Sequence, residues 1–250
     1  RSRLVHHVNF FPRALPVMMQ TRLRCGDYER VLGQFKSLMR QEPDEAYLYS
    51  HRGEVLLWGG RWAQAARHFR RAWELNDDLL WPKVGLAAVE LLSGDARAGL
   101  AEIERLAAFG SESILLPWRV EGCRRLGLHD RVVAACARFA EPLPFRPHLW
   151  MNLALSRLAT GAKSEARRIV AGLRRQAPEF LADAARAAGA PAAGAWSEPQ
   201  TRKTLLAGLA AMRGNRSRWL YTYFTPDGRL KIVRLHGVRP EQIPTQLKRN

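Results

Sequence analysis

The sequence predicts an all-α fold, a right-handed α-solenoid of stacked helical hairpins, followed by a small C-terminal α+β appendage that contains a β-hairpin. Three observations predict this fold. Apolar positions recur at a shift of 34 residues, a glycine precedes each recurrence, and the helical periodicity gives way to a strand pattern near residue 218. A single helical hairpin cannot cover its own apolar face, so hairpins that repeat at this interval must stack.

The recurring apolar positions have the spacing i, i+3, i+4, i+7, i+10, i+11, which forms one stripe along an α-helix. The first set comprises Tyr28, Val31, Leu32, Phe35, Leu38 and Met39. A shift of 34 gives Trp62, Ala65, Ala66, Phe69, Ala72 and Trp73, and a second shift gives Ala96, Gly99, Leu100, Ile103, Leu106 and Ala107. This repetition favours a recognition scaffold over an enzyme, because stacked repeats build extended binding surfaces.

Each stripe follows a glycine that can end one helix in the left-handed conformation and let the chain reverse. The glycines are Gly26, Gly60, Gly94, Gly127 and Gly161, at intervals of 34, 34, 33 and 34 residues. Pro43, Pro144 and Pro178 stand 17 residues after three of them, where the second helix of a pair is expected to stop. A chance periodicity in an Ala/Leu-rich helical bundle is the alternative, and it does not require glycines at these intervals.

This pattern resembles the tetratricopeptide repeat family, whose unit is an antiparallel helix pair of 34 residues. The best unit has the family's small, small, aromatic and small residues at Gly53, Ala65, Phe69 and Ala72. The third and fourth units are degenerate, with Gly99 and Val132 where Ala is usual. The resemblance implies a helical domain over 1–181 with five partly degenerate units, at about 12–45, 46–79, 80–112, 113–146 and 147–181.

In that family the first helices line a concave groove, and its groove-facing positions carry over to this chain. They are Tyr47, Glu54, Trp58, Trp81, Arg124, Arg125 and His148, with Glu121 beside the arginines. The resemblance implies a protein or peptide partner whose apolar side chains contact the two tryptophans and whose acidic side chains contact the two arginines. The Lys/Asn set with which related chaperone adaptors hold a C-terminal carboxylate is absent. Ordinary packing between repeats is the alternative role for Trp81.

Beyond the repeats, we expect a closing helix and linker over 182–197 and a basic unit over 198–250. Ser197 is placed to cap a helix from Glu198 to Met212. A turn at Pro226–Gly228 then joins the predicted strands of a β-hairpin, which are Arg218–Phe224 and Arg229–Leu235.

Aromatic and basic side chains alternate in this hairpin, which is a pattern used to bind polyanions. The candidate residues are Arg216, Arg218, Trp219, Tyr221, Arg229, Lys231 and Arg234. The chain carries a formal net charge of +17, of which +12 falls in residues 147–250. Nucleic acid or anionic lipid is therefore a second possible partner. Packing of the aromatics on the preceding helix, and a composition that only keeps the protein soluble, are the alternatives.

No motif for phosphate binding, zinc hydrolysis or a nucleophilic serine is present, so we expect neither an enzyme nor a metal or other cofactor. The three cysteines, Cys25, Cys123 and Cys136, lack C-x-x-C spacing and fit buried reduced thiols. With no visible signal peptide, they favour a cytoplasmic location. We expect a scaffold or adaptor that binds a protein segment within a larger assembly. Polyanion binding through the hairpin is the alternative, and a regulatory domain of a longer signalling protein, as in some bacterial response regulators, is a third.

Overall fold

A computed structural model describes residues 28–108, 112–137, 147–192, 194–211, 221–224 and 230–233. The helices in this part of the chain are α2 (Tyr28–Gln41), α3 (Ala46–Trp58), α4 (Trp62–Leu75), α5 (Leu80–Ser93), α6 (Ala96–Leu106), α7 (Glu112–Arg125), α8 (His129–Ala137), α9 (Pro147–Ala159), α10 (Lys163–Gln176), α11 (Pro178–Ala187) and α12 (Glu198–Ala211). The strands are β1 (Tyr221–Phe224) and β2 (Leu230–Val233).

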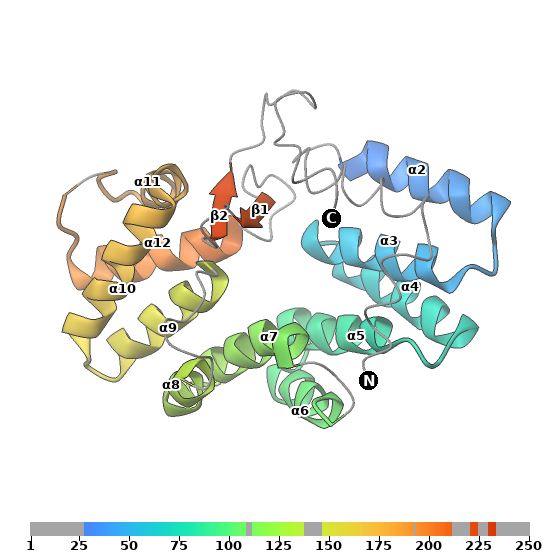
Figure 1. Ribbon diagram of the computed structural model, residues 1–250, viewed down its shortest axis with the longest axis horizontal. Helices are drawn as coiled ribbons and strands as arrows, with labels where there is room; N and C mark the ends of the chain where they lie inside the picture. Colours follow the sequence, from blue (N-terminus) through green and yellow to red (C-terminus); the bar gives the residue numbers. More distant parts are fainter. Residues whose placement is uncertain are drawn as a thin grey trace.

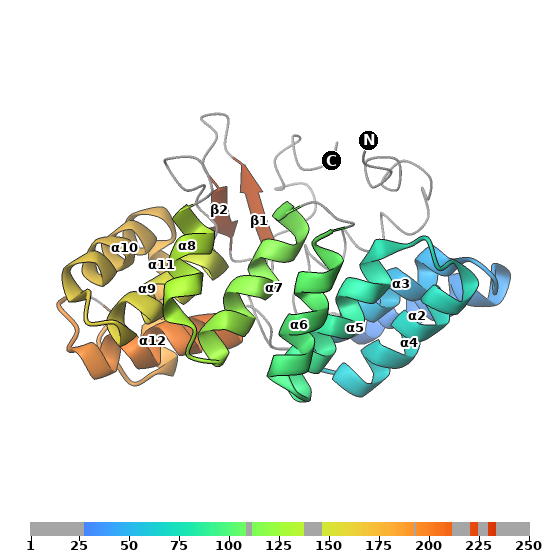
Figure 2. The same cartoon turned by 90° about the horizontal axis from the view of Figure 1, so that it is seen from below.

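Consecutive helices pack as hairpins, α3 with α4, α5 with α6, α7 with α8 and α9 with α10. The hairpins stack into an arch in which α3, α5, α7 and α9 follow the inner side, whereas α6 and α8 lie outside (Figure 1). Figure 2, turned to show the arch from below, presents the same row of helices from α4 to α10 side by side. Within the described residues, the predicted all-α solenoid of helical hairpins is confirmed.

The two strands pair antiparallel, with Tyr221 opposite Val233 and Phe224 opposite Leu230, and β2 lies beside α10. Residues 212–220, 225–229 and 234–250 of the expected basic unit lie outside the described residues. The β-hairpin appendage therefore stays a prediction.

Three of the spaced glycines adopt the expected left-handed backbone, with φ of +74° at Gly60, +72° at Gly127 and +79° at Gly161. Gly94 does not, since its φ is −118° and its ψ is −133°. Side chains end α5 there instead, because the Glu90 carboxylate accepts the backbone N–H of Asp95 at 2.8 Å. The expectation of a left-handed turn is thus wrong at Gly94, and Gly26 lies outside the described residues.

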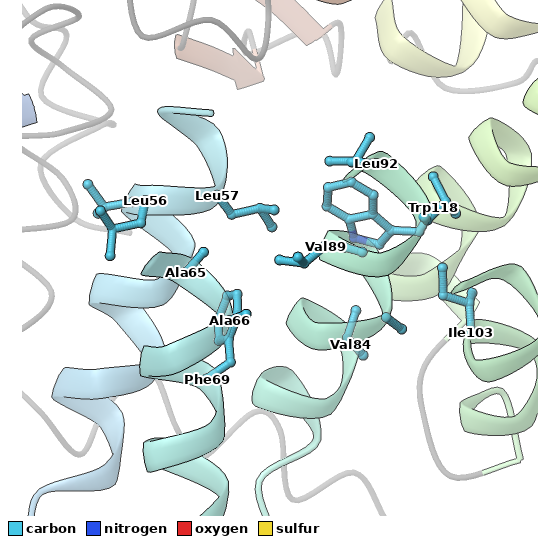
Figure 3. Close-up of a cluster of buried hydrophobic side chains, with 14 of the residues drawn as sticks. Leu56, Leu57, Ala65, Ala66, Phe69, Val84, Val89, Leu92, Ile103 and Trp118 are labelled. Carbon is cyan, nitrogen blue, oxygen red and sulfur yellow. The ribbon is translucent and has the colours of Figure 1, made fainter. Parts of the chain in front are cut away.

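The ring of Phe69 on α4 is fully buried between two helices that carry glycine where they meet it (Figure 3). A Cβ added to Gly53 of α3 would lie 2.7 Å from the ring, and one added to Gly85 of α5 would also lie 2.7 Å from a ring carbon. The contact joins one hairpin to the next. Figure 3 shows the same core continuing toward α7, from which Trp118 reaches Leu92 of α5.

The end of the helical stack differs from the predicted division of the chain. Helix α10 ends at Gln176, so the second helix of the fifth unit stops before Pro178 as predicted. Pro178 also begins α11, because proline at the first helical position has its φ preset for a helix. The predicted boundary at 181 therefore falls inside α11. Helix α12 packs on both α11 and α9, and its Leu205 and Leu209 share a core with Phe180. Among the described residues, α12 therefore packs as part of the helical stack.

Ser197 caps α12 as the sequence predicts. Its Oγ accepts the backbone N–H of Gln200 at 3.4 Å, and the Gln200 side chain accepts the backbone N–H of Ser197 at 2.9 Å. This reciprocal pair satisfies two N–H groups at the start of the helix. In the described part of the chain, no helix combines the length and apolar character needed to cross a membrane.

Gly99 of α6 stands where the tetratricopeptide family usually has Ala, and we predict that Ala destabilises this protein there. A Cβ at Gly99 would lie 2.7 Å from the Cα of Leu91 in α5, and helix backbone cannot move aside as a flexible side chain can. Gly99→Ala should lower the free energy of unfolding by about 1–3 kcal/mol in urea titrations followed by circular dichroism. Gly33→Ala in α2 is the control. Nothing lies within 4 Å of a Cβ added at Gly33, so this substitution should raise the free energy of unfolding by about 0.5–1 kcal/mol. An unchanged stability for Gly99→Ala would contradict the close approach of α5 and α6.

Candidate functional site

A buried carboxylate gathers three of the predicted groove residues at the contact between α7 and α9. Glu121 of α7 is fully buried, and its Oε1 accepts Nε–H of Arg125 at 3.0 Å and lies 3.6 Å from a terminal nitrogen of Arg124. Its other oxygen, Oε2, lies 2.8 Å from Nε2 of His148 in α9. Because α7 and α9 are neighbours along the inner side of the arch (Figure 1), the cluster joins two successive hairpins.

Local sequence spacing explains this geometry. Residues three and four positions apart lie on one side of a helix, so Arg124 and Arg125 both reach back to Glu121. On α9, Asn152 lies one turn after His148 and donates to the His148 carbonyl oxygen at 2.8 Å. The Asn152 side-chain oxygen also accepts Nε–H of Arg124. Sequence reasoning missed Asn152, whose only signal is a polar residue at a helix position otherwise occupied by apolar ones.

Burial changes the proton affinities in this cluster. Desolvation, and secondarily the charge of Arg125, lowers the pKa of Arg124 to about 10, while burial alone lowers the pKa of Arg125. Both guanidinium groups therefore remain charged at neutral pH. Burial, with Arg124 as the smaller cause, lowers the pKa of His148 to about 4. With its pKa lowered in this way, His148 contacts Glu121 through a hydrogen bond from Nε2–H.

Arg125 is the most accessible side chain of this cluster. Its side chain is 35% exposed, against 15% for Arg124 and 14% for His148. Nε of Arg125 is held by Glu121, and the two terminal nitrogens have no hydrogen-bond or ion-pair partner within the described residues. A guanidinium fixed in this way presents two parallel N–H donors, which is the arrangement that binds a carboxylate.

The other predicted groove residues lie elsewhere on the inner helices. Tyr47 and Glu54 are on α3, which α5 separates from α7 (Figure 1). Glu54 is buried with its Oε2 4.0 Å from Nδ1 of His51, and the Tyr47 ring lies 6.4 Å from the His51 ring. Burial, followed by the charge of Glu45, raises the pKa of Tyr47. Trp81 of α5 is partly buried against the largest core cluster, and the Trp58 side chain lies outside the described residues.

The polyanion-binding candidates of the C-terminal unit are placed only in part. Tyr221 lies in β1 and Lys231 in β2, and their side chains are not among those described. The others, Arg216, Arg218, Trp219, Arg229 and Arg234, lie outside the described residues.

In the described residues, no group of three or more His, Cys, Asp or Glu side chains is placed to hold a metal ion. Cys123 and Cys136 are buried and unpaired with each other. Burial raises the pKa of both thiols, that of Cys136 to about 11, so neither forms a reactive thiolate at neutral pH.

Neither a protein-family model nor a curated protein matches this chain. Among solved structures, the crystal structure of the MamA protein is similar with a TM-score of 0.46 and 13% sequence identity. The match covers 65% of this chain and 88% of that one. A likeness at this level says nothing about what either protein binds.

We predict that lowering the pH from 7 to 5 destabilises the protein through His148. The unfolded chain takes up a proton at this residue below its ordinary pKa of 6.5, whereas the folded protein does not until the pH approaches 4. The contribution of His148 to the free energy of unfolding is therefore present above pH 6.5 and is lost as the pH falls. The loss between pH 7 and 5 should be about 1–2 kcal/mol. His148→Gln keeps an N–H donor for Glu121 and should shrink the loss by that amount in urea unfolding at the two pH values. Equal losses in both proteins would show that the folded protein protonates His148.

Proposed function

We propose that this protein is a non-catalytic scaffold that binds a segment of a partner protein along its inner helices. An acidic side chain of the partner binds at Arg125, with Arg124 behind it. The observation that supports this proposal is the Arg125 guanidinium, which is held by a buried carboxylate and has its terminal nitrogens available.

The arch suits this role because successive inner helices contribute side chains to one continuous surface. A flexible arginine on a surface loses about 0.5–1.5 kcal/mol of side-chain entropy when a ligand orders it. Glu121 has already ordered Arg125, so most of that cost is met when the protein folds. The arrangement thus favours an acidic residue at one position of the bound segment.

The apolar part of the binding surface is assigned to Trp58 on α3 and Trp81 on α5, two helices and one helix before α7 along the inner side. Trp81 is partly buried against the core, which is a common state of an aromatic contact residue. The proposed segment therefore carries apolar side chains toward α3 and α5 and an acidic side chain toward α7 and α9.

We test the proposal with an array of random peptides of about 12 residues, long enough to span several inner helices. Wild-type protein should enrich peptides that combine apolar residues with Asp or Glu. A hydrogen bond between charged groups contributes about 1.5–3 kcal/mol, so Arg125→Gln should weaken binding of those peptides roughly 10- to 100-fold. The control is Arg70→Gln on α4, an exposed arginine without an ion pair among the described residues.

Two results would contradict the proposal. One is a set of enriched peptides without acidic residues, and the other is an equal loss of binding in Arg125→Gln and Arg70→Gln. The second result would show that only the overall positive charge of the protein matters.

A further inference from the structure

Basic side chains outnumber acidic ones in α9 to α12, and nearly all of the acidic ones already form ion pairs. Residues 147–211 contain nine basic and four acidic side chains. Three of the four acids form ion pairs: Glu165 with Arg157 at 2.9 Å, Asp183 with Arg186 at 2.6 Å, and Glu198 with Lys163 at 2.9 Å and Arg202 at 3.4 Å. The fourth, Glu179, is exposed on α11. The surplus of positive charge therefore has no internal counter-charge.

That surplus gathers on one face of α10. Arg167, Arg168 and Arg175 are exposed, and no ion pair or hydrogen bond joins their side chains to any described residue. At about 100° per residue, the three fall within an arc of about 100°, with only Ser164 and Ala171 between them. Along the axis they span about 12 Å.

Arg174 borders this face and is oriented by its neighbours. Its guanidinium lies 4.5 Å from the centroid of the Trp196 ring and donates to the Gly194 carbonyl oxygen at 2.9 Å. Elsewhere among the described helices, comparable exposed arginines are less concentrated: Arg40 lies on α2, Arg67 and Arg70 on α4 and Arg97 on α6. The three-arginine face of α10 is therefore a local feature and not only a consequence of composition.

We propose that this face of α10, formed by Arg167, Arg168 and Arg175, binds the phosphate backbone of a nucleic acid. Guanidinium groups pair with phosphate oxygens through parallel N–H donors, and such contacts need no particular base sequence. The proposal does not depend on the inner-helix site, which lies on α7 and α9.

The residues between the arginines favour nucleic acid over a membrane. Helices that lie on lipid place large apolar side chains such as Trp, Phe or Leu beside their basic residues. On α10 the intervening residues are Ser164 and Ala171. The large apolar side chains exposed in the described part of the chain, Trp62, Trp73, Leu128 and Leu206, all lie on other segments. A backbone of phosphates needs only the charges that α10 presents.

The test is a fluorescence-anisotropy titration of the full 250-residue chain against a labelled DNA of about 20 nucleotides, single-stranded and as a duplex, at roughly 50 to 200 mM salt. Affinity should fall steeply with salt. The variant Arg167→Gln/Arg168→Gln/Arg175→Gln should bind at least tenfold more weakly, and the slope of log K against log salt should lose about 2 to 3 units, since each phosphate contact contributes about 0.7–0.9. The control, Arg67→Gln/Arg70→Gln/Arg97→Gln, removes the same charge and should change both quantities little.

Three results would overturn the proposal. The first is equal weakening by the two triple variants, which would reduce the effect to net charge. The second is binding unaffected by the α10 substitutions, which would move it to residues 212–250. The third is no DNA binding at the lowest salt, with or without α10-dependent binding to phosphatidylserine vesicles. Circular dichroism checks that each variant folds, and if the α10 triple does not, Arg167→Gln/Arg175→Gln replaces it with an expected slope change of about 1.5.

Discussion

The stack depends on the space that two glycines leave for the ring of Phe69. Gly53 on α3 and Gly85 on α5 have no Cβ at the points where they meet the ring, so an aromatic side chain from α4 can lie between two helices and stay fully buried. The ring thereby fixes the distance between one hairpin and the next. Gly99 of α6 continues the arrangement by letting its helix lie directly on the backbone of α5. Because interiors are closely packed, small changes in these spacings would move every later hairpin.

The site on α7 and α9 is a consequence of that spacing. A carboxylate as buried as Glu121 is costly unless charged partners and hydrogen bonds surround it. Its own helix supplies Arg124 and Arg125, but His148 reaches it only because α9 packs beside α7. The electrostatics of the site therefore depend on how the two hairpins pack. The same contacts that satisfy Glu121 leave one arginine oriented and partly exposed, which is what recognition of an acidic residue requires.

Periodicity predicted the stacked hairpins well because apolar spacing and glycine turns are local signals. It failed where side chains replaced the expected backbone signal, as at Gly94, where Glu90 ends the helix. It was right that the second helix of the fifth unit stops before Pro178, but it did not show that Pro178 also begins α11. In the site, the family's positions pointed to Arg124, Arg125 and His148. Asn152 could not be found because its contact with Arg124 joins two different helices. Contacts between distant segments have no signature in a single sequence.

The arginines of this chain also show why net charge alone does not identify a function. On α7, Arg124 and Arg125 are partly buried and share one carboxylate, so dissolved ions screen them little. On α10, Arg167, Arg168 and Arg175 are exposed without a counter-charge among the described residues. Dissolved salt therefore screens their attraction to a charged partner, which at 0.1 M salt weakens over a distance of about 10 Å. The first arrangement suits the proposed recognition of a single acidic group held at short range. The second suits the proposed salt-sensitive attraction to many phosphates at once. Two surfaces with the same side chain can therefore serve different partners, and the burial of each arginine, together with what it already contacts, decides which partner it fits.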